Sequence, residues 1–328
     1  MAIKTIIVLV VGLALASVQL AEAQQTKKMP RIGFLALTPP AALSTRVEAF
    51  RQGLRGLGYA EGKNISIDYR FAEGESDRLP ALAAELVRLK VDVIVTSGPI
   101  PTRAAKEATS AIPIVMGFDN DPVGNGFIAS LARPGGNITG LSTLGPEISG
   151  KQLELLKEIV PKLSRVAVFG TSTRPGNAQL LKEVELAAGA IGVKLQYLDI
   201  LGPTDIETAF RAAGKGHADA VLMMLAGGIA SAHRSEVVEL AVKSRLPAIY
   251  DRVEFVEAGG LMTYSESSTD LFRRAAYYVD KILKGAKPAD LPVEQPMKFE
   301  FIINLKAAEQ IGLTIPPNVL ARATKLIK

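Results

Sequence analysis

Residues 31–37 (Arg-Ile-Gly-Phe-Leu-Ala-Leu) form a short apolar run, and a stretch with helical spacing of apolar residues follows from Leu43 to Leu57. A run of this length predicts a buried strand, and the amphipathic stretch after it predicts a helix that covers the sheet. The same alternation recurs along most of the chain. It predicts an α/β architecture, with parallel sheets covered by helices on both faces.

The alternation falls into two series, separated by a stretch with turn chemistry. That stretch runs from Asp119 to Gly140, is rich in Gly, Pro, Asn and Asp, and contains one expected helical turn near Phe127 to Leu131. In the first series we predict strands at 31–37, 64–70, 91–97 and 112–117, and helices at 43–57, 77–89 and 101–108. In the second we predict strands at 165–169, 194–200, 218–224 and 247–250, and helices at 150–160, 177–190, 205–213 and 231–244.

These series define two lobes, and the last quarter of the chain adds to both of them. The first lobe spans residues 29–141 plus about 260–285, and the second spans 142–255 plus about 290–328. The added pieces are a strand at 260–264, a helix at 270–284, a strand at 298–303 and a helix at 305–311. The predicted fold class is therefore two doubly wound parallel-sheet lobes, joined by a hinge of several segments that restricts them to a closing motion.

The N-terminal residues have the pattern of a secretory signal peptide. Lys4 precedes an apolar run from Ile6 to Ala16, and Ala21-Glu22-Ala23 matches an A-x-A cleavage site. The run is too short for a bilayer-spanning helix, although an uncleaved anchor is the alternative. We expect removal of residues 1–23 and release into the periplasm, because there is no Cys to carry a lipid.

The composition argues against several classes of function. The 328 residues have a net charge of +5, but acidic and basic side chains are interleaved, so no nucleic-acid partner is expected. The two histidines, His217 and His233, lie outside any metal-binding motif. No P-loop, Gly-x-Ser-x-Gly elbow or dinucleotide fingerprint follows a strand. We therefore expect no metal, no cofactor and no enzymatic activity.

Candidate binding residues lie after the predicted strands, because ligands of parallel sheets bind at the carboxyl ends of the strands. In the first lobe, Ser97, Gly98, Pro99 and Thr102 offer hydroxyls and free N–H groups that suit a carboxylate or another anion. Ser97 and Thr102 could equally cap the following helix. Asp119 could pair with a ligand ammonium group, or it could form an Asx turn.

The second lobe offers matching loops at its own strand ends. Thr171 follows the first strand of this lobe, Gly227 the third, and Tyr250 and Tyr264 stand at the ends of two later strands. A tyrosine at the edge of a cleft presents an apolar face with a polar tip. The convergence of such groups at equivalent strand ends of two lobes predicts a ligand-binding cleft between them.

Several longer motifs occur in order along nearly the whole mature chain. They include residues 31–35 (RIGFL), 92–98 (DVIVTSG), 130–140 (SLARPGGNITG), 255–264 (FVEAGGLMTY), 278–296 (YVDKILKGAKPADLPVEQP) and 303–316 (INLKAAEQIGLTIP). Together they resemble the ABC-transporter substrate-binding protein family that includes tryptophan-binding and other amino-acid-binding members. The chain departs from this pattern after Phe169, where relatives often carry an Asn-Pro loop, and at Leu225 to Ala230, where a bulkier residue is common.

The resemblance implies a type I periplasmic-binding fold, in which three crossing segments join two lobes and the ligand closes between them. It also implies a membrane permease and a cytoplasmic ATPase as partners. Carried over by position, the family's cleft would include Ser97 to Pro99 and Asp119 on one lobe. Opposite them would lie the loops near Thr171 and Gly227 and the segments around Tyr250 and Tyr264.

The function that we expect is that of the periplasmic solute-binding component of an ABC importer. The monomer would capture a small organic solute, such as an amino acid or a related carboxylate, by hinge closure. Two alternatives remain. One is an exported sensor subunit with the same lobes. The other is an exported α/β enzyme that uses Asp119 with Tyr250 or Tyr264 for acid–base chemistry.

Overall fold

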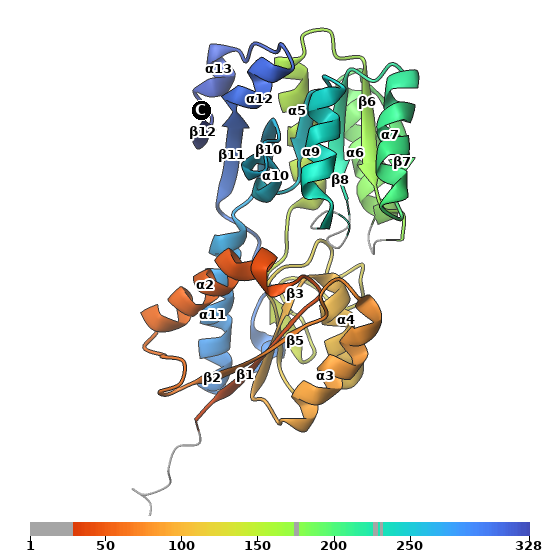
Figure 1. The fold of residues 1–328 in the computed structure, drawn as a ribbon. Helices are drawn as coiled ribbons and strands as arrows, with labels where there is room; N and C mark the ends of the chain where they lie inside the picture. Colours follow the sequence, from red (N-terminus) through yellow and green to blue (C-terminus); the bar gives the residue numbers. More distant parts are fainter. Residues whose placement is uncertain (1–28, 174–176, 226–228, 230–231) are drawn as a thin grey trace, which may run out of the picture. The chain divides into compact units, whose positions relative to one another are not determined.

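The computed structural model of this chain describes residues 29–173, 177–225, 229 and 232–328. Residues Arg31–Lys328 form one compact unit. The predicted signal peptide lies outside the described residues. The compact unit contains two sheets, each covered by helices on both faces (Figure 1). No helix in the described ranges has both the length and the apolar character needed to cross a bilayer.

The first sheet has five parallel strands in the order β2-β1-β3-β4-β5. The strands are β1 (Arg31–Ala36), β2 (Ser66–Phe71), β3 (Val93–Ser97), β4 (Ile114–Met116) and β5 (Ile138–Gly140). Its covering helices are α2 (Pro40–Gly56), α3 (Leu79–Arg88), α4 (Pro99–Ala108) and α11 (Ser268–Leu283). A 3-10 turn at Ser76–Arg78 leads into α3. Because β2 and β3 lie on opposite sides of β1, the sheet is doubly wound, as predicted.

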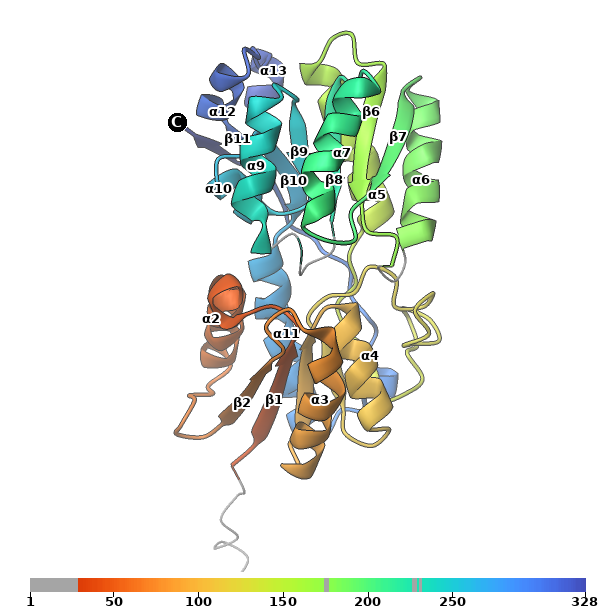
Figure 2. The same cartoon turned by 45° about the vertical axis from the view of Figure 1, so that its right-hand side comes forward.

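Alternate residues of the buried strands face opposite sides of this sheet, as the period of two in a β-strand requires. In β1, Ile32 and Phe34 pack with α2 and α11, whereas Leu35 packs with α3 and α4. Helix α11 comes from the late part of the chain, yet it lies beside α2 (Figure 2). Burial of both faces explains why β1 is a continuous apolar run and not an alternating one.

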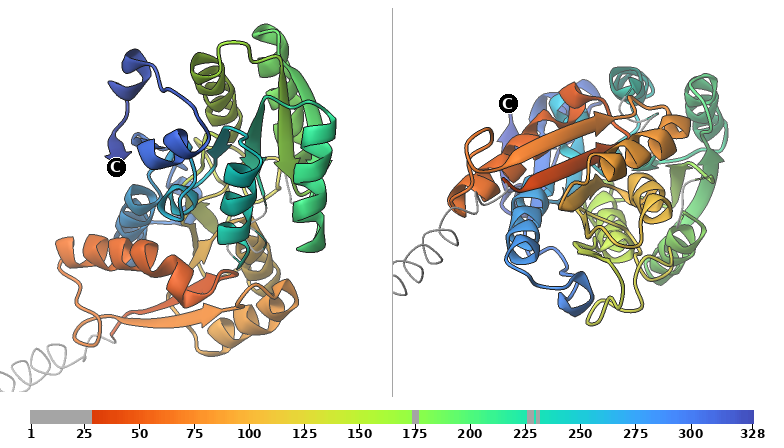
Figure 3. Two further views of the ribbon diagram at one scale, coloured as in Figure 1. Left: turned by 45° about the horizontal axis from the view of Figure 1, so that its top comes forward. Right: turned by 90° about the horizontal axis from the view of Figure 1, so that it is seen from below.

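The second sheet has seven strands in the order β12-β11-β10-β9-β8-β6-β7. All neighbouring strands are parallel except β10 and β11, which are antiparallel to each other. The last part of the chain therefore adds one antiparallel strand pair to an otherwise parallel sheet. The chain ends along the β11 edge (Figure 3). The strands are β6 (Arg165–Gly170), β7 (Lys194–Asp199), β8 (Ala220–Met224), β9 (Ala248–Tyr250), β10 (Met262–Glu266), β11 (Phe299–Asn304) and β12 (Lys325–Ile327).

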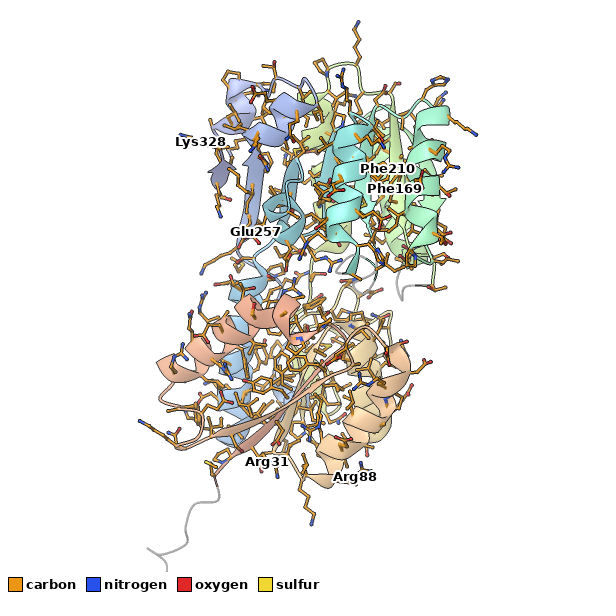
Figure 4. The ribbon with its side chains drawn as sticks, viewed as in Figure 1. Arg31, Arg88, Phe169, Phe210, Glu257 and Lys328 are labelled. Atoms are coloured by element: carbon orange, nitrogen blue, oxygen red, sulfur yellow. The ribbon has the colours of Figure 1, made fainter. Side chains whose placement is uncertain are left out.

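Helices cover the second sheet in the same two-sided manner. Val166 and Val168 of β6 pack with α5, α6, α12 and α13, while Ala167 and Phe169 pack with α7, α9 and α10. Phe169 meets Phe210 of α7 edge to face, with ring centroids 4.8 Å apart (Figure 4). These helices are α5 (Gly145–Ile159), α6 (Asn177–Ala190), α7 (Thr204–Lys215), α9 (Arg234–Lys243), α10 (Val253–Glu257), α12 (Leu305–Gln310) and α13 (Pro317–Leu320).

The chain passes between the two sheets in three places within its described residues. The first passage follows β5, the second lies between β10 and α11, and the third follows Glu294, whose backbone pairs with Leu141 of the first. One predicted boundary needs correction: the strand near residue 260 is β10, which belongs to the second sheet, whereas α11 and the segment after it as far as Val293 pack on the first. The fold class itself is confirmed.

Other differences from the prediction concern short elements. Residues from Phe127 to Leu131 form bends and irregular backbone instead of a helical turn. The turn lies just before them, and the N–H groups of Phe127 and Ile128 both donate to the carbonyl of Pro122. Strands β5 and β12 and helices α10 and α13 were not predicted. Each has three to five residues, so its conformation depends on a neighbouring strand or helix more than on its own sequence.

Candidate functional site

A cavity of about 210 Å³ is lined by residues that follow strands of both sheets. Thr38 follows β1, Ser97 ends β3 and Phe118 lies just beyond β4, whereas Leu225 follows β8 and Asp251 follows β9. A cavity needs only about 10–15 Å³ to hold one water molecule, so this one has room for a small organic molecule. Its position matches the expectation that ligands of parallel sheets bind at the carboxyl ends of the strands.

Ser97, Gly98 and Pro99, which are candidate binding residues from the sequence, all line this cavity. Gly98 precedes the first turn of α4 with a φ of +103°, a conformation that L side chains rarely adopt. A Cβ at Gly98 would also lie 3.1 Å from the Phe118 ring. The glycine therefore leaves the backbone accessible at a helix N-terminus. Pro99 and Pro101 carry no N–H, so the N–H of Ile100 and the helix dipole are what favour an anion there.

Thr102 supports this turn from within and does not line the cavity. Its fully buried Oγ1 donates to the Gly98 carbonyl oxygen at 2.9 Å, and it lies 2.7 Å from Oγ1 of Thr96. The Thr102 hydroxyl therefore bonds back to the carbonyl at the start of α4 and does not cap the N–H groups of the helix, for which the structure shows no side-chain cap.

Asp119 is fully buried behind the cavity, although the residues on either side of it, Phe118 and Asn120, are part of the lining. Its Oδ1 accepts hydrogen bonds from the Asp121 N–H at 2.9 Å and from Asn125 Nδ2 at 2.8 Å. This is the Asx-turn arrangement considered above.

The second carboxylate oxygen of Asp119 is the unusual feature. Oδ2 is buried and has no hydrogen-bond partner among the described residues. Burial raises the pKa of Asp119 to about 6, and the hydrogen bonds from Asn125 and from the Asp121 N–H only partly oppose this. The carbonyl of Asp119 also accepts a hydrogen bond of 2.7 Å from the N–H of Thr143, in the first passage between the sheets. The backbone of Asp119 therefore connects the loop beside the cavity to the hinge.

Three of the predicted residues of the second lobe, Thr171, Tyr250 and Tyr264, do not line the cavity. Tyr250 is buried and stacks on Phe255, and Tyr264 stacks on Phe299; neither is part of the lining. Thr171 is buried, with its Oγ1 donating to the Ile200 carbonyl at 3.1 Å. Gly227 lies outside the described residues. The cavity lining thus does not bring together Asp119 with Tyr250 or Tyr264, the groups considered for acid–base chemistry.

Glu266 is a cavity residue that the sequence analysis did not select. It ends β10, and its Oε1 accepts a hydrogen bond of 2.9 Å from the N–H of Leu144, across two of the hinge segments. Burial raises the pKa of Glu266, and no Lys or Arg forms an ion pair with it among the described residues. The strand-end rule could have found it, but the predicted strand at 260–264 ends two residues before β10 does.

Arg46 and Glu254 form an ion pair in the cavity lining that no local pattern reveals. Arg46, on α2 of the first lobe, is 7% exposed, and its Nη2 donates to Oε1 of Glu254, on α10 of the second lobe, at 2.6 Å. Burial by itself raises the pKa of Glu254, but Arg46 and then Arg252 lower it below its ordinary value. The two partners lie 208 residues apart in the sequence, so only the fold brings them together.

The lining thus combines charged groups of both signs with an apolar surface. A helix N-terminus and two arginines can attract an anionic group, and Glu266 can accept hydrogen bonds from a cationic one. Leu180, Met223, Met224 and Leu225 supply apolar side chains from the second lobe. The described residues contain no group of three or more His, Cys, Asp or Glu side chains that could hold a metal ion.

Comparisons with known proteins agree with this picture. Residues 32–327 match the family model described as ABC transporter substrate binding protein. A tyrosine-binding protein of Clostridioides difficile (strain R20291) is 27% identical over 293 residues, which cover 88% of this chain and 84% of that protein.

Two crystal structures have closely similar folds. A conserved domain protein from Vibrio cholerae superposes with a TM-score of 0.85 at 30% identity, covering 91% of this chain and all of that one. An ABC domain from Streptococcus pneumoniae, in complex with L-Trp, superposes with a TM-score of 0.84 at 27% identity, covering 91% of this chain and 99% of that one.

Proposed function

Since this chain belongs to the family of ABC transporter substrate-binding proteins, we propose that its cavity captures an amino acid or a related carboxylate for import. The observation that carries the proposal is the cavity of about 210 Å³, which residues of both lobes line. It combines an anion-binding helix N-terminus, an unpaired carboxylate and an apolar wall. A zwitterion with an apolar side chain has the complementary set of groups.

Each part of such a solute has a partner in the lining. The carboxylate binds at the turn of Ser97 and Gly98, where the Ser97 hydroxyl and the N–H of Ile100, in the first turn of α4, donate hydrogen bonds. The ammonium group binds Glu266, which is buried and has no cationic partner of its own. The side chain packs on Met224 and Leu225. The tyrosine-binding relative and the L-Trp complex support this class of ligand.

Capture proceeds by closure of the lobes around the solute. Three segments connect the sheets, and Glu266 is bonded to one of them through the Leu144 N–H, so binding at Glu266 acts directly on the hinge. Because the chain has no Cys, dyes can be attached at Arg88→Cys on α3 and Arg211→Cys on α7, both exposed. Saturating solute should shift the transfer efficiency between them, and an unchanged efficiency would contradict closure.

The setting that we propose is the periplasm, with a membrane permease and a cytoplasmic ATPase as partners and a monomer as the working form. The signal-peptide pattern of residues 1–23 supports export, and the family supports the partners. In this role the protein releases its solute chemically unchanged. Recovery of an altered product after incubation with the purified protein would contradict the proposal.

A solute panel tests the ligand class. Thermal unfolding is measured with L-amino acids, simple carboxylates and monosaccharides, because a solute at a hundred times its Kd stabilises the native state by about 2.7 kcal/mol. Glu266→Gln should weaken binding of the best amino acid about tenfold to a hundredfold, since a charge-assisted hydrogen bond contributes about 1.5–3 kcal/mol. Glu257→Gln, an exposed residue of α10 (Figure 4), is the matched control. Stabilisation by sugars alone would overturn the proposal.

A further inference from the structure

A second, smaller pocket adjoins the solute cavity and is rich in arginine. It measures about 10 Å³, and its lining includes Arg46, Arg234, Arg252 and Glu254. Arg46, Arg252, Glu254 and Thr38 also line the larger cavity, so the two spaces share a wall. We propose that this pocket is an anion subsite, which binds either a halide ion or, in place of the turn of Ser97 and Gly98, one oxygen of the captured solute's carboxylate.

The charges around the pocket do not balance. Three guanidinium groups face one carboxylate, Glu254, and among the described residues the one other acid that forms an ion pair with any of them is Asp251, 3.4 Å from Nε of Arg252. This leaves one positive charge in excess, because arginine remains protonated in proteins. The undescribed residues nearest in sequence, 226–228 and 230–231, are Ala, Gly, Gly, Ala and Ser, so they bring no compensating charge.

Two of the guanidinium groups retain hydrogen-bonding capacity. The side chain of Arg46 is more than nine-tenths buried, and its Nε has no hydrogen-bond partner among the described residues. Arg234, in the first turn of α9, forms no ion pair with a carboxylate of the described chain. A buried donor without an acceptor is costly, and an anion would satisfy it and reduce the repulsion among the guanidinium groups.

The pocket is small enough for a single ion, and residues of both lobes line it. Its volume corresponds to a single water-sized occupant, which a halide ion or one carboxylate oxygen matches and a phosphate group exceeds. Arg46 belongs to α2 of the first lobe, whereas Arg234 and Arg252 belong to the second. An anion held by all three would therefore stabilise the contact between the lobes, and solute affinity would rise with its concentration.

The first test concerns the anion alone and does not depend on the proposed function. The line width of the chloride-35 resonance is measured with the purified protein at constant ionic strength, with gluconate replacing chloride. Wild type should broaden the resonance, Arg234→Gln and Arg252→Gln should reduce the broadening at least threefold, and the exposed Arg211→Gln on α7 should leave it unchanged. Equal broadening by all four proteins would overturn the subsite, as would crystals grown in bromide with only water in the pocket.

The second test distinguishes the two sources of the anion and rests on the proposed function. The amino acid that binds best in the solute panel is added to saturation in chloride. If its carboxylate occupies the subsite, the excess chloride broadening disappears. If the halide is a separate occupant, the broadening persists, and the Kd of the solute increases when gluconate replaces chloride. Either outcome supports an anion subsite, whereas a Kd independent of chloride together with persistent broadening would overturn its role in linking the lobes.

Discussion

The pH dependence of stability should reveal the buried carboxyl group of Asp119. Its pKa is about 6 in the native protein, because of burial, against an ordinary value of 3.8. The native state therefore keeps a proton that the unfolded chain loses between about pH 4 and pH 6, and stability must fall as the pH rises through this window. The difference of 2.2 pH units, at about 1.36 kcal/mol each, gives about 3 kcal/mol.

Asp119→Asn isolates this effect because the amide keeps the Oδ1 acceptor for the Asp121 N–H and for Asn125 Nδ2 but carries no charge. Urea unfolding of both proteins between about pH 4 and pH 7 gives the difference in free energy of unfolding. We expect the free energy of unfolding of the variant, relative to that of wild type, to increase by about 3 kcal/mol as the pH rises across this range. Glu257→Gln controls for the loss of an exposed carboxylate. A difference that stays constant with pH would refute the reasoning, since Asp119 would then be charged in both states or neutral in both.

Two further predictions concern stability alone and are tested by denaturant unfolding. Gly140→Ala should cost about 3 kcal/mol, because the added Cβ would lie 2.3 Å from the Met116 carbonyl oxygen at the start of the hinge. Gly62→Ala, also at positive φ but with open space around it, should cost only about 1 kcal/mol; equal losses would contradict the steric argument. Phe169→Ala should cost about 4 kcal/mol, and a double-mutant cycle with Phe210→Ala should give a coupling of about 1 kcal/mol. A coupling near zero would mean that the edge-to-face contact adds no stability beyond that from burial of the two rings.

The fold was largely predictable from sequence because its main signals are local. A strand buried on both faces, such as β1, is a continuous apolar run, and each long helix shows its period within a single stretch. Strand β10 was assigned to the wrong lobe because its own residues do not specify its neighbours. It pairs with β9 and with β11, and hydrogen bonds to strands distant in sequence leave no local pattern.

The site, like the fold, contains a part that local sequence signals predict and a part that they do not. The turn of Ser97, Gly98 and Pro99 was predictable, since a Gly-Pro step after a buried strand marks a strand end and a helix start at once. Tyr250 and Tyr264 satisfy the same rule, yet both rings stack on phenylalanines and neither lines the cavity. A strand end places the backbone near the ligand, but the surrounding packing decides whether a side chain points toward it.

The sequence by itself determined the two α/β lobes, the family resemblance and the strand-end loops around the cavity, because each depends on patterns within a few dozen residues. Only the tertiary structure decided which charges meet there. Arg46 lies in the middle of a helix and Glu254 in a short one, and they meet because α2 and α10 come together from different lobes. Coulomb energy depends on distance in space and on burial, and neither is a property of position along the chain.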